Sequence, residues 1–378
     1  MPTATHRLTR TVLPGAAMIA MTFGLARYGY GLLLPEMQAE LHLSADAAGL
    51  ISSGAFLSYL AANSLTVWLT AKRGPRWALG GATGLAVVGM TVVAAATNAT
   101  SLAVGVVVAG AAAGLAFPPY ADIVEVEVTP ARRALAWSTI SSGTGWGVAL
   151  AGPIAVAAGQ SWRLAWLVFV AVAVGVGVLA VLRAPARAAI RPRRVELSWS
   201  WFVCPRSGPL LVSAVLIGLG SSVWWAFSVD ALREAGIAAT PARIAYAVCG
   251  VAGILASLSG TVFTALGLRR GYVTSVVLLT AALVLLGTGT NLALALVAAV
   301  LFGAGYNAVV AAQGLWSAVV FADRPSAGLA AVNTALTIGT IVGPTAAGVL
   351  VEWSGYPAAL LAAAGCTMLA VTRTPPAG

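Results

Sequence analysis

The sequence is poor in charged side chains: Asp, Glu, Lys and Arg make up 8% of the chain, whereas about 25% is usual for a soluble domain. With 60% hydrophobic residues and a mean hydropathy of +0.93, the chain cannot cover itself with a water-soluble surface. The composition therefore excludes a soluble enzyme and a free binding module. The same hydrophobicity excludes a disordered chain.

Residues that carry enzyme chemistry are also scarce. The only histidines, His6 and His42, fall outside the apolar runs, which argues against an embedded serine/histidine hydrolase or a histidine-ligated metal centre. The three cysteines form no redox or metal motif, and no Gly-Lys-Ser/Thr loop indicates an ATP site. We expect no enzyme activity, no cofactor and no metal.

The chain consists instead of apolar runs bounded by charged residues, Pro or Gly. At about 20 apolar residues per crossing, 378 residues hold about a dozen spans. The runs cover 11–35, 46–70, 77–97, 101–122, 134–158, 162–182, 208–230, 242–266, 272–290, 292–321, 327–350 and 356–372. They predict an all-α membrane protein with twelve transmembrane helices, in which bundles 1–182 and 208–378 flank a basic cytoplasmic linker, 183–207.

The distribution of basic residues predicts the orientation. With the N-terminus in the cytoplasm, 17 of the 21 Lys and Arg residues fall in cytoplasmic segments, and only Arg163, Arg233 and Arg243 fall in outer loops. Cytoplasmic loops of membrane proteins are enriched in Lys and Arg. The net charge of +10 is thus explained by topology without nucleic acid, and both termini are expected in the cytoplasm.

The two halves repeat one another, which predicts parallel six-helix repeats. At an offset of 191 residues, the matches are Gly114 with Gly305, Arg133 with Arg324, Gly152-Pro153 with Gly343-Pro344, and Trp162 with Trp353. At an offset of 197, Lys72-Arg73-Gly74 matches Arg269-Arg270-Gly271. Transporters built from such repeats bind substrate near the bilayer midplane and expose it to each side in turn.

With this organisation, the chain resembles the major facilitator superfamily. Lys72, Gly74 and Arg76 match that family's cytoplasmic loop motif, although Ala71 stands where the family usually has Asp. Gly143, Gly147 and Gly152-Pro153 resemble the Gly-Pro motif of exporting antiporters, and the segment 23–35 is similar to a bacterial branch of uncharacterised sugar- or drug-efflux-like permeases. The resemblance implies a small-molecule transporter, with Lys72, Gly74 and Arg76 in gating.

Arg27 is the most informative single residue because it falls near the middle of the first apolar run. A lone cation at that depth costs at least a few kcal/mol unless it faces water or a partner. It either binds an anionic or polar group of the substrate or ties the first helix to carbonyl groups of a neighbour. Helical spacing places Phe23 and Tyr30 on the face of Arg27.

Asp122 is the acidic residue closest to a predicted span. It is either a proton site or the partner of Arg132 or Arg133 in an inner gate. Pro118-Pro119 is expected to kink or break the fourth helix, which makes Tyr120 a candidate for substrate contact.

Further candidates are polar or aromatic residues inside apolar runs. Trp224 is either an interfacial aromatic or a stacking surface for substrate. The amides bind substrate or bond between helices. The full set of these residues is Trp146, Trp224, Asn307, Gln313 and Asn333.

The sequence thus predicts a monomeric secondary transporter in a bacterial plasma membrane. It would move a small anionic or amphipathic molecule by alternating access, with proton-coupled efflux as the preferred direction. No carboxylate falls at the middle of a span, so a uniporter or organic-anion importer, or coupling through Asp122 or Asp230, remains open. A second class is a non-transporting membrane sensor on the same fold.

Overall fold

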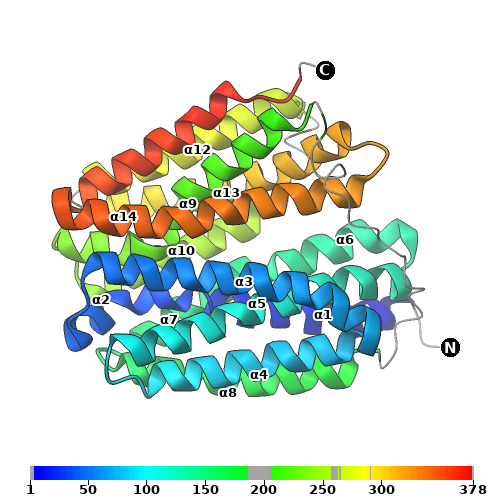
Figure 1. Cartoon of the computed structure of the whole chain (residues 1–378), viewed down its shortest axis with the longest axis horizontal. Helices are drawn as coiled ribbons and strands as arrows, with labels where there is room; N and C mark the ends of the chain where they lie inside the picture. Colours follow the sequence, from blue (N-terminus) through cyan, green and yellow to red (C-terminus); the bar gives the residue numbers. More distant parts are fainter. Residues whose placement is uncertain are drawn as a thin grey trace. The chain divides into compact units, whose positions relative to one another are not determined.

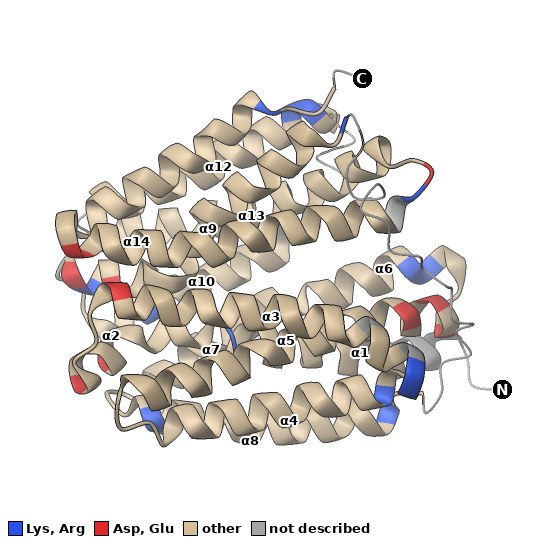
Figure 2. Ribbon diagram, viewed as in Figure 1, with Lys and Arg blue, Asp and Glu red and all other residues tan. Residues whose placement is uncertain are grey.

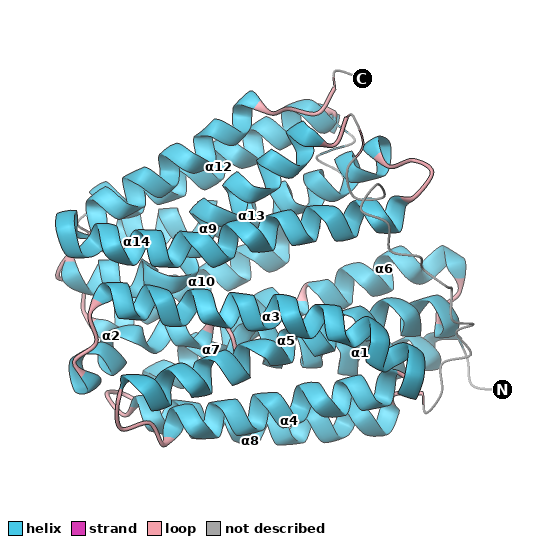
Figure 3. Ribbon diagram, viewed as in Figure 1, coloured by secondary structure: helices cyan, strands magenta, loops and turns pink. Residues whose placement is uncertain are grey.

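The computed structural model describes residues 4–185, 204, 206–256, 263, 265–289 and 291–376, and the regular elements within these ranges are all helices (Figures 1 and 3). Ten helical stretches within these ranges, some of which join successive elements, are long and apolar enough to cross a membrane, and Ala239–Leu255 forms a shorter apolar helix. The all-helical expectation is confirmed for this part of the chain, whereas the number of twelve crossings stays a prediction. Most of the expected linker, 186–203 and 205, lies outside the described residues.

Contacts divide the chain into two compact units. Unit 1 comprises Met1–His42 and Gly54–Arg194, and unit 2 comprises Leu43–Ser53 and Val195–Gly378. The helices of unit 1 are α1 (Ala4–Ile19), the π-helical segment η1 (Ala20–Leu25), α2 (Gly29–Leu41), most of α3 (Ala45–Arg73), α4 (Pro75–Ala94), α5 (Ala99–Glu127), α6 (Pro130–Ser141), α7 (Gly143–Ala157) and α8 (Trp162–Arg183). Within this unit, α4 packs against α5 and α8, and η1 packs against α7.

Unit 2 holds the remaining helices. They are α9 (Gly208–Glu234), α10 (Ala239–Ala256), α12 (Leu268–Thr288), α13 (Leu292–Val320), α14 (Pro325–Leu369) and the 3-10 turn η3 (Ala370–Thr372). The long α14 is two helices joined at Gly355, whose φ of 78° and ψ of 171° are not helical. Only glycine adopts such a backbone readily, so the sequence marks this corner.

Several of the expected spans differ from the helices observed, and the first of them, 11–35, is divided into α1, η1 and α2. The helix-breaking effect expected of Pro118 and Pro119 does not end α5, which continues through both residues to Glu127. The run 134–158 instead forms two helices, α6 and α7, on either side of Ser142.

Large apolar side chains cover the outer surface of the helices. Leu164 and Leu182 of α8 are 51% and 70% exposed, and the same helix also exposes Leu167, Val174 and Val178. Soluble monomers rarely expose contiguous apolar patches of this kind. Hydrocarbon is the solvent that matches such a surface.

Most of the described basic residues of unit 1 gather at one end of the bundle. There α3 ends with Lys72 and Arg73, and α4 and α6 begin with Arg76, Arg132 and Arg133 in their first turns (Figure 2). The opposite end, where α8 begins, carries Arg163.

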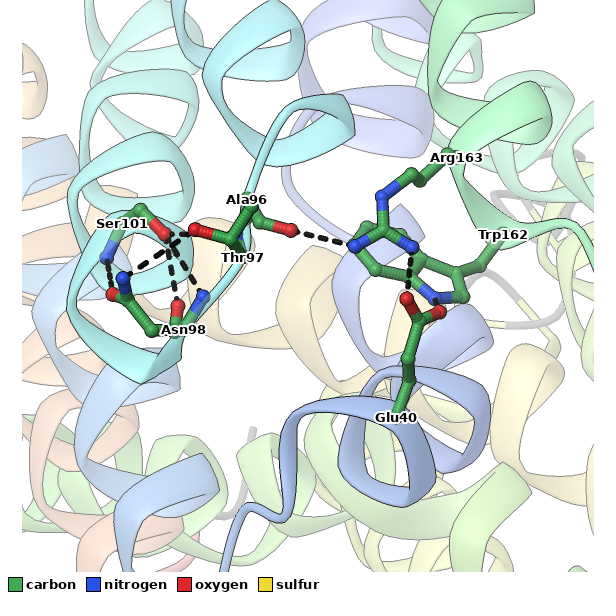
Figure 4. A network of polar contacts seen from close by, with 7 residues as sticks. All are labelled: Glu40, Ala96, Thr97, Asn98, Ser101, Trp162 and Arg163. Atoms are coloured by element: carbon green, nitrogen blue, oxygen red, sulfur yellow. Dashed lines mark hydrogen bonds and ion pairs between the residues drawn. The ribbon is translucent and has the colours of Figure 1, made fainter.

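A polar network fixes that opposite end of unit 1 (Figure 4). Glu40, at the end of α2, accepts hydrogen bonds from Trp162 Nε1 (2.6 Å) and from the guanidinium of Arg163. Arg163 also donates to the carbonyl of Ala96 (2.7 Å), in the connection between α4 and α5. The carboxylate of Glu40 thus joins α2 to α8. Arg163 also links α8 to the segment between α4 and α5.

The repeat is visible where equivalent helices begin, and these positions are 193 residues apart. Asn98 and Asn291, 193 residues apart, each accept a hydrogen bond from the backbone three residues on and cap α5 and α13. Gly74 (φ 89°) and Gly267 (φ 76°), also 193 apart, precede α4 and α12. The pairing of Gly74 with Gly271 at offset 197 is therefore wrong, because Gly271 lies inside α12.

Each unit contains a helix crossing at which two glycines meet backbone. In unit 1, a Cβ on Gly147 of α7 would lie 2.1 Å from the Ala20 carbonyl oxygen, and one on Gly24 would lie 2.3 Å from the backbone of Gly147. In unit 2, Gly218 and Gly339 would meet carbonyls of Leu336 and Val215 at 2.0 and 2.1 Å. The first helix of each half therefore contacts the fifth without intervening side chains, as small residues in membrane helices allow.

We expect Gly147→Ala to destabilise the protein by at least about 1–3 kcal/mol, because the added methyl must push η1 away from α7. Thermal unfolding in detergent measures the effect. Gly175→Ala is the matched control, since that helical glycine of α8 has nothing within 4 Å of its Cβ position. Equal unfolding temperatures for the two variants would contradict the close crossing.

Candidate functional site

The first helix of unit 1 is irregular at its centre. The backbone N–H groups of Ala26 and Tyr28 donate to the carbonyls of Met21 and Phe23, five residues earlier, both at 2.9 Å. This π-type winding replaces α-helix between α1 and α2, and Arg27 lies in the turn that follows η1. Such π segments are frequent at functional sites, because they reposition side chains that a regular helix would hold in register.

Aromatic rings surround the guanidinium of Arg27. Its Cζ atom lies over the rings of Tyr59 and Phe56, 4.2 and 4.4 Å from their centroids, and 5.5 Å from those of Phe23 and Tyr28. A cation within about 6 Å of a ring centroid is attracted by the quadrupole of the ring. These four rings, which we call the aromatic cage, therefore hold the cation of Arg27 by their faces.

The cage leaves the hydrogen-bonding capacity of Arg27 unused. The side chain is only 9% exposed, and its buried Nε has no hydrogen-bond partner. Among the described residues, the guanidinium has no ion pair either. A buried cation without hydrogen bonds or a counter-charge is costly, so this arginine is suited to bind an acceptor that arrives from outside the fold.

A row of aromatic rings continues from the cage. Phe23 makes edge-to-face contacts with Tyr59 and Phe117, each at 5.8 Å between centroids, and Phe117 contacts Trp137 of α6 at 4.9 Å. Phe23, Phe117 and Trp137 are half-buried, so part of each ring surface is accessible. We call these three residues the aromatic row.

The sequence identified part of this arrangement. Phe23 contacts Arg27 as the i−4 spacing predicts. Tyr30, predicted on the same face, is buried in α2 and is not one of the four rings of the cage. Sequence reasoning missed five rings, namely Tyr28, Phe56, Tyr59, Phe117 and Trp137. A signal existed for two of them: Phe56 and Tyr59 are three residues apart, which puts both on one face of α3.

Other predicted contact residues lie apart from the cage or pack inside a unit. Tyr120 is 2% exposed in α5, and its ring would lie 3.0 Å from a Cβ on Gly15. Trp146 of α7 is 51% exposed. Neither residue has a described contact with Arg27.

In unit 2, the candidates do not form one cluster. Trp224 is buried and stacks on Phe302, with 4.3 Å between centroids. Asn307 donates to the Gly303 carbonyl of its own helix (2.9 Å), and Asn333 is exposed on α14.

Gln313 is part of a buried polar chain in unit 2. Its Nε2 donates to Ser213 Oγ (2.8 Å), which bonds to the hydroxyl of Tyr272 (2.8 Å), and this hydroxyl in turn donates to the Ala370 carbonyl (3.0 Å). The chain joins α9, α12, α13 and η3. This placement fits the alternative that the amide bonds between helices.

The predicted gating residues make local contacts at the basic end of unit 1. Lys72 Nζ lies 4.5 Å from the ring centroid of Trp68, and Gly74 forms the positive-φ turn before α4. Arg76 donates to the Ala184 carbonyl (2.9 Å), at the end of α8.

Asp122 and Arg133 do not pair. Arg133 donates instead to the carbonyls of Glu125 (2.5 Å) and Val128 (3.2 Å), where α5 ends. Asp122 is half-buried, and no ion pair to it is found within the described part of the chain. Backbone carbonyls at the helix end thus take two of the donors of Arg133, and the inner gate around Asp122 stays a prediction.

A second acidic residue is more deeply buried than Asp122. Asp230, near the end of α9, is 8% exposed and accepts a hydrogen bond from the hydroxyl of Tyr356. Searched over the described residues, the chain shows no group of three or more His, Cys, Asp or Glu side chains that could hold a metal ion.

The family model of the Major Facilitator Superfamily matches residues 16–228, more than half of the chain, and no curated protein sequence matches it. A crystal structure of a mutant of the nucleoside transporter NupG superposes with a TM-score of 0.79 at 13% identity, covering 96% of this chain and 98% of NupG. A bacterial homologue of the human lysosomal transporter Spinster, inward-facing and unoccupied, gives 0.74 at 14% identity, covering 97% and 95%. At these identities the likeness shows the fold.

If the rings hold the cation of Arg27, Arg27→Met and Tyr59→Leu should not be additive in stability. We expect a coupling free energy of about 1 kcal/mol from a double-mutant cycle of thermal unfolding in detergent. The control cycle combines Tyr59→Leu with Arg163→Met, whose guanidinium lies over Trp162 instead. Additive effects in the first cycle would show that the contact does not stabilise the protein.

Proposed function

The chain belongs to the Major Facilitator Superfamily, and from this premise we propose that it moves a small organic molecule across a membrane by alternating access, with Arg27 and the aromatic cage in its binding site. It is a multi-pass membrane transporter and not an enzyme. The observation that carries the proposed site is the buried, unpaired Nε of Arg27 beside a π-helical interruption.

The arrangement of this site favours binding over a structural role. In the structural alternative, Arg27 would donate to carbonyls of a neighbouring helix, but no such bond to it is found among the described residues. Interrupted helices near the bilayer midplane commonly line substrate sites in transporters. The cage keeps the cation in place while its N–H groups stay available.

We extend the proposal to the whole chain. The protein has twelve crossings, acts as a monomer in a bacterial plasma membrane, and keeps both termini in the cytoplasm. Three observations support the crossings and the orientation: the apolar helices, the corner at Gly355 inside α14, and the basic residues at the end of unit 1 where α3 ends. Efflux in exchange for protons is the proposed direction, and a uniporter or an organic-anion importer is the alternative.

We expect Arg27→Ala to abolish transport while the protein still inserts into the membrane, because the ligand loses its charged donor but the helices keep their apolar surfaces. Flux of a compound found by a thermal-shift screen is measured in proteoliposomes. Arg163→Ala, at the end of the bundle, is the matched control and should transport at close to the original rate. Normal flux in Arg27→Ala would contradict the proposal that Arg27 binds the substrate. Binding without flux in the original protein would indicate a sensor.

Proton coupling is tested with an imposed pH gradient. We place the proton on Asp122, so a gradient should drive the substrate against its concentration in the original protein and not in Asp122→Asn. Exchange of labelled for unlabelled substrate, which needs no net proton movement, should persist in that variant. If Asp230→Asn loses coupling and Asp122→Asn keeps it, Asp230 is the residue that carries the proton. Equal flux with and without the gradient would indicate a uniporter.

A further inference from the structure

The chemistry around Arg27 restricts the class of substrate. This inference rests on the proposed function, because it concerns the ligand of the same site. Three features of unit 1 bear on it: the charge of Arg27, the direction in which its N–H groups remain available, and the accessible rings beside it.

The first feature is a single positive charge without a counter-charge. Arg27 is nine-tenths buried, and the other basic residues of unit 1 whose side chains are described lie at the ends of helices. An anionic ligand would supply the missing charge. A ligand with two negative charges would leave one of them without a cation in this apolar setting, which is costly.

The second feature is the geometry of the cage. A guanidinium is planar, and its five N–H groups point outward in its own plane. The Cζ atom lies 4.2 and 4.4 Å from the ring centroids of Tyr59 and Phe56, and because ring faces accept none of the strong hydrogen bonds of the group, the donors along its edge remain for a ligand. The group that fits such an edge is a planar acceptor with two parallel oxygens, which is a carboxylate.

The third feature is the aromatic row. Phe23 belongs to both the cage and the row, so the rings of Phe117 and Trp137 continue directly from the cation. All three rings are partly accessible. A flat apolar group stacks well against such rings, in offset or edge-to-face contact.

We infer that the substrate is an organic monocarboxylate with a flat apolar body, whose carboxylate accepts two hydrogen bonds from Arg27 while its body lies against Phe23, Phe117 and Trp137. A phosphate monoester, with a charge of about −1.5 to −2 at pH 7, fits this single cation less well. Uncharged molecules leave the Arg27 donors without an anion.

Binding to the purified protein tests the inference without any variant. The probes are 1-naphthoate, its uncharged isostere 1-naphthamide, and a naphthalene dicarboxylate, titrated at pH 7.5 in detergent by calorimetry. We expect the monocarboxylate to bind roughly tenfold to a hundredfold more tightly than the amide, the range for a hydrogen bond to a charged group. The dicarboxylate should bind more weakly than the monocarboxylate. Equal affinity for acid and amide, or a preference for the dicarboxylate, would overturn the inference.

Variants then show which residue causes the preference for the acid over the amide. Arg27→Gln should bring the ratio of the two dissociation constants close to one, and Arg27→Lys, which keeps the charge but not the planar fork, should lower the ratio without removing it. Trp137→Leu is the matched control, because it should weaken acid and amide by a similar factor and leave the ratio unchanged. An undiminished preference in a folded Arg27→Gln would overturn the inference. If that variant does not fold, the wild-type ratio and the Trp137→Leu result decide.

The flux measurement separates this inference from the proposed function. If naphthamide is transported and its transport depends on Arg27, the proposed transport function stands and the inferred carboxylate substrate is wrong. If naphthoate binds but no carboxylate is transported, the inferred anion site stands and the proposed transport function is wrong.

Discussion

The structure of the site depends on one physical constraint, which is that a guanidinium cannot be buried in an apolar bundle without compensation. Arg27 receives that compensation from aromatic faces and not from a carboxylate or from carbonyl groups. Ring faces stabilise the positive charge but accept none of its strong hydrogen bonds. The fold can therefore keep this cation in place while its donors stay free, and an ion pair within the protein could not do so.

The position of Arg27 depends in turn on a close helix crossing in unit 1. Gly24 and Gly147 bring the backbone of η1 against α7, and no side chain fits between them. Lipid offers no hydrophobic drive for helices to associate, so close van der Waals contact between backbones has to supply it. The π-helical winding lies at this contact, and the turn that presents Arg27 to α3 follows directly. The helix packing and the position of Arg27 thus depend on the same short segment of the chain.

Each half of the chain uses the same devices at corresponding places. Both have a glycine pair where their first and fifth helices cross, and both have an asparagine cap, Asn98 or Asn291, before the fourth helix. The halves differ in their polar chemistry. In unit 1, Arg27 lies among the rings of the aromatic cage, whereas Gln313 in unit 2 donates to Ser213 in a buried chain that joins helices. The repeat therefore explains the shared architecture, while the buried polar side chains differ between the halves.

The sequence by itself determined the solvent and the all-helical class, because both follow from composition and from the length of the apolar runs. Its motifs supplied the family resemblance, and the cost of a charge in hydrocarbon singled out Arg27 as a candidate. Only the tertiary structure decided which rings surround that arginine. Phe56, Tyr59, Phe117 and Trp137 come from three other helices, and a one-dimensional pattern does not say which helix faces meet. It also decided that α5 continues through its two prolines and that Arg133 bonds to carbonyls at a helix end, since both outcomes depend on the neighbours that satisfy the backbone.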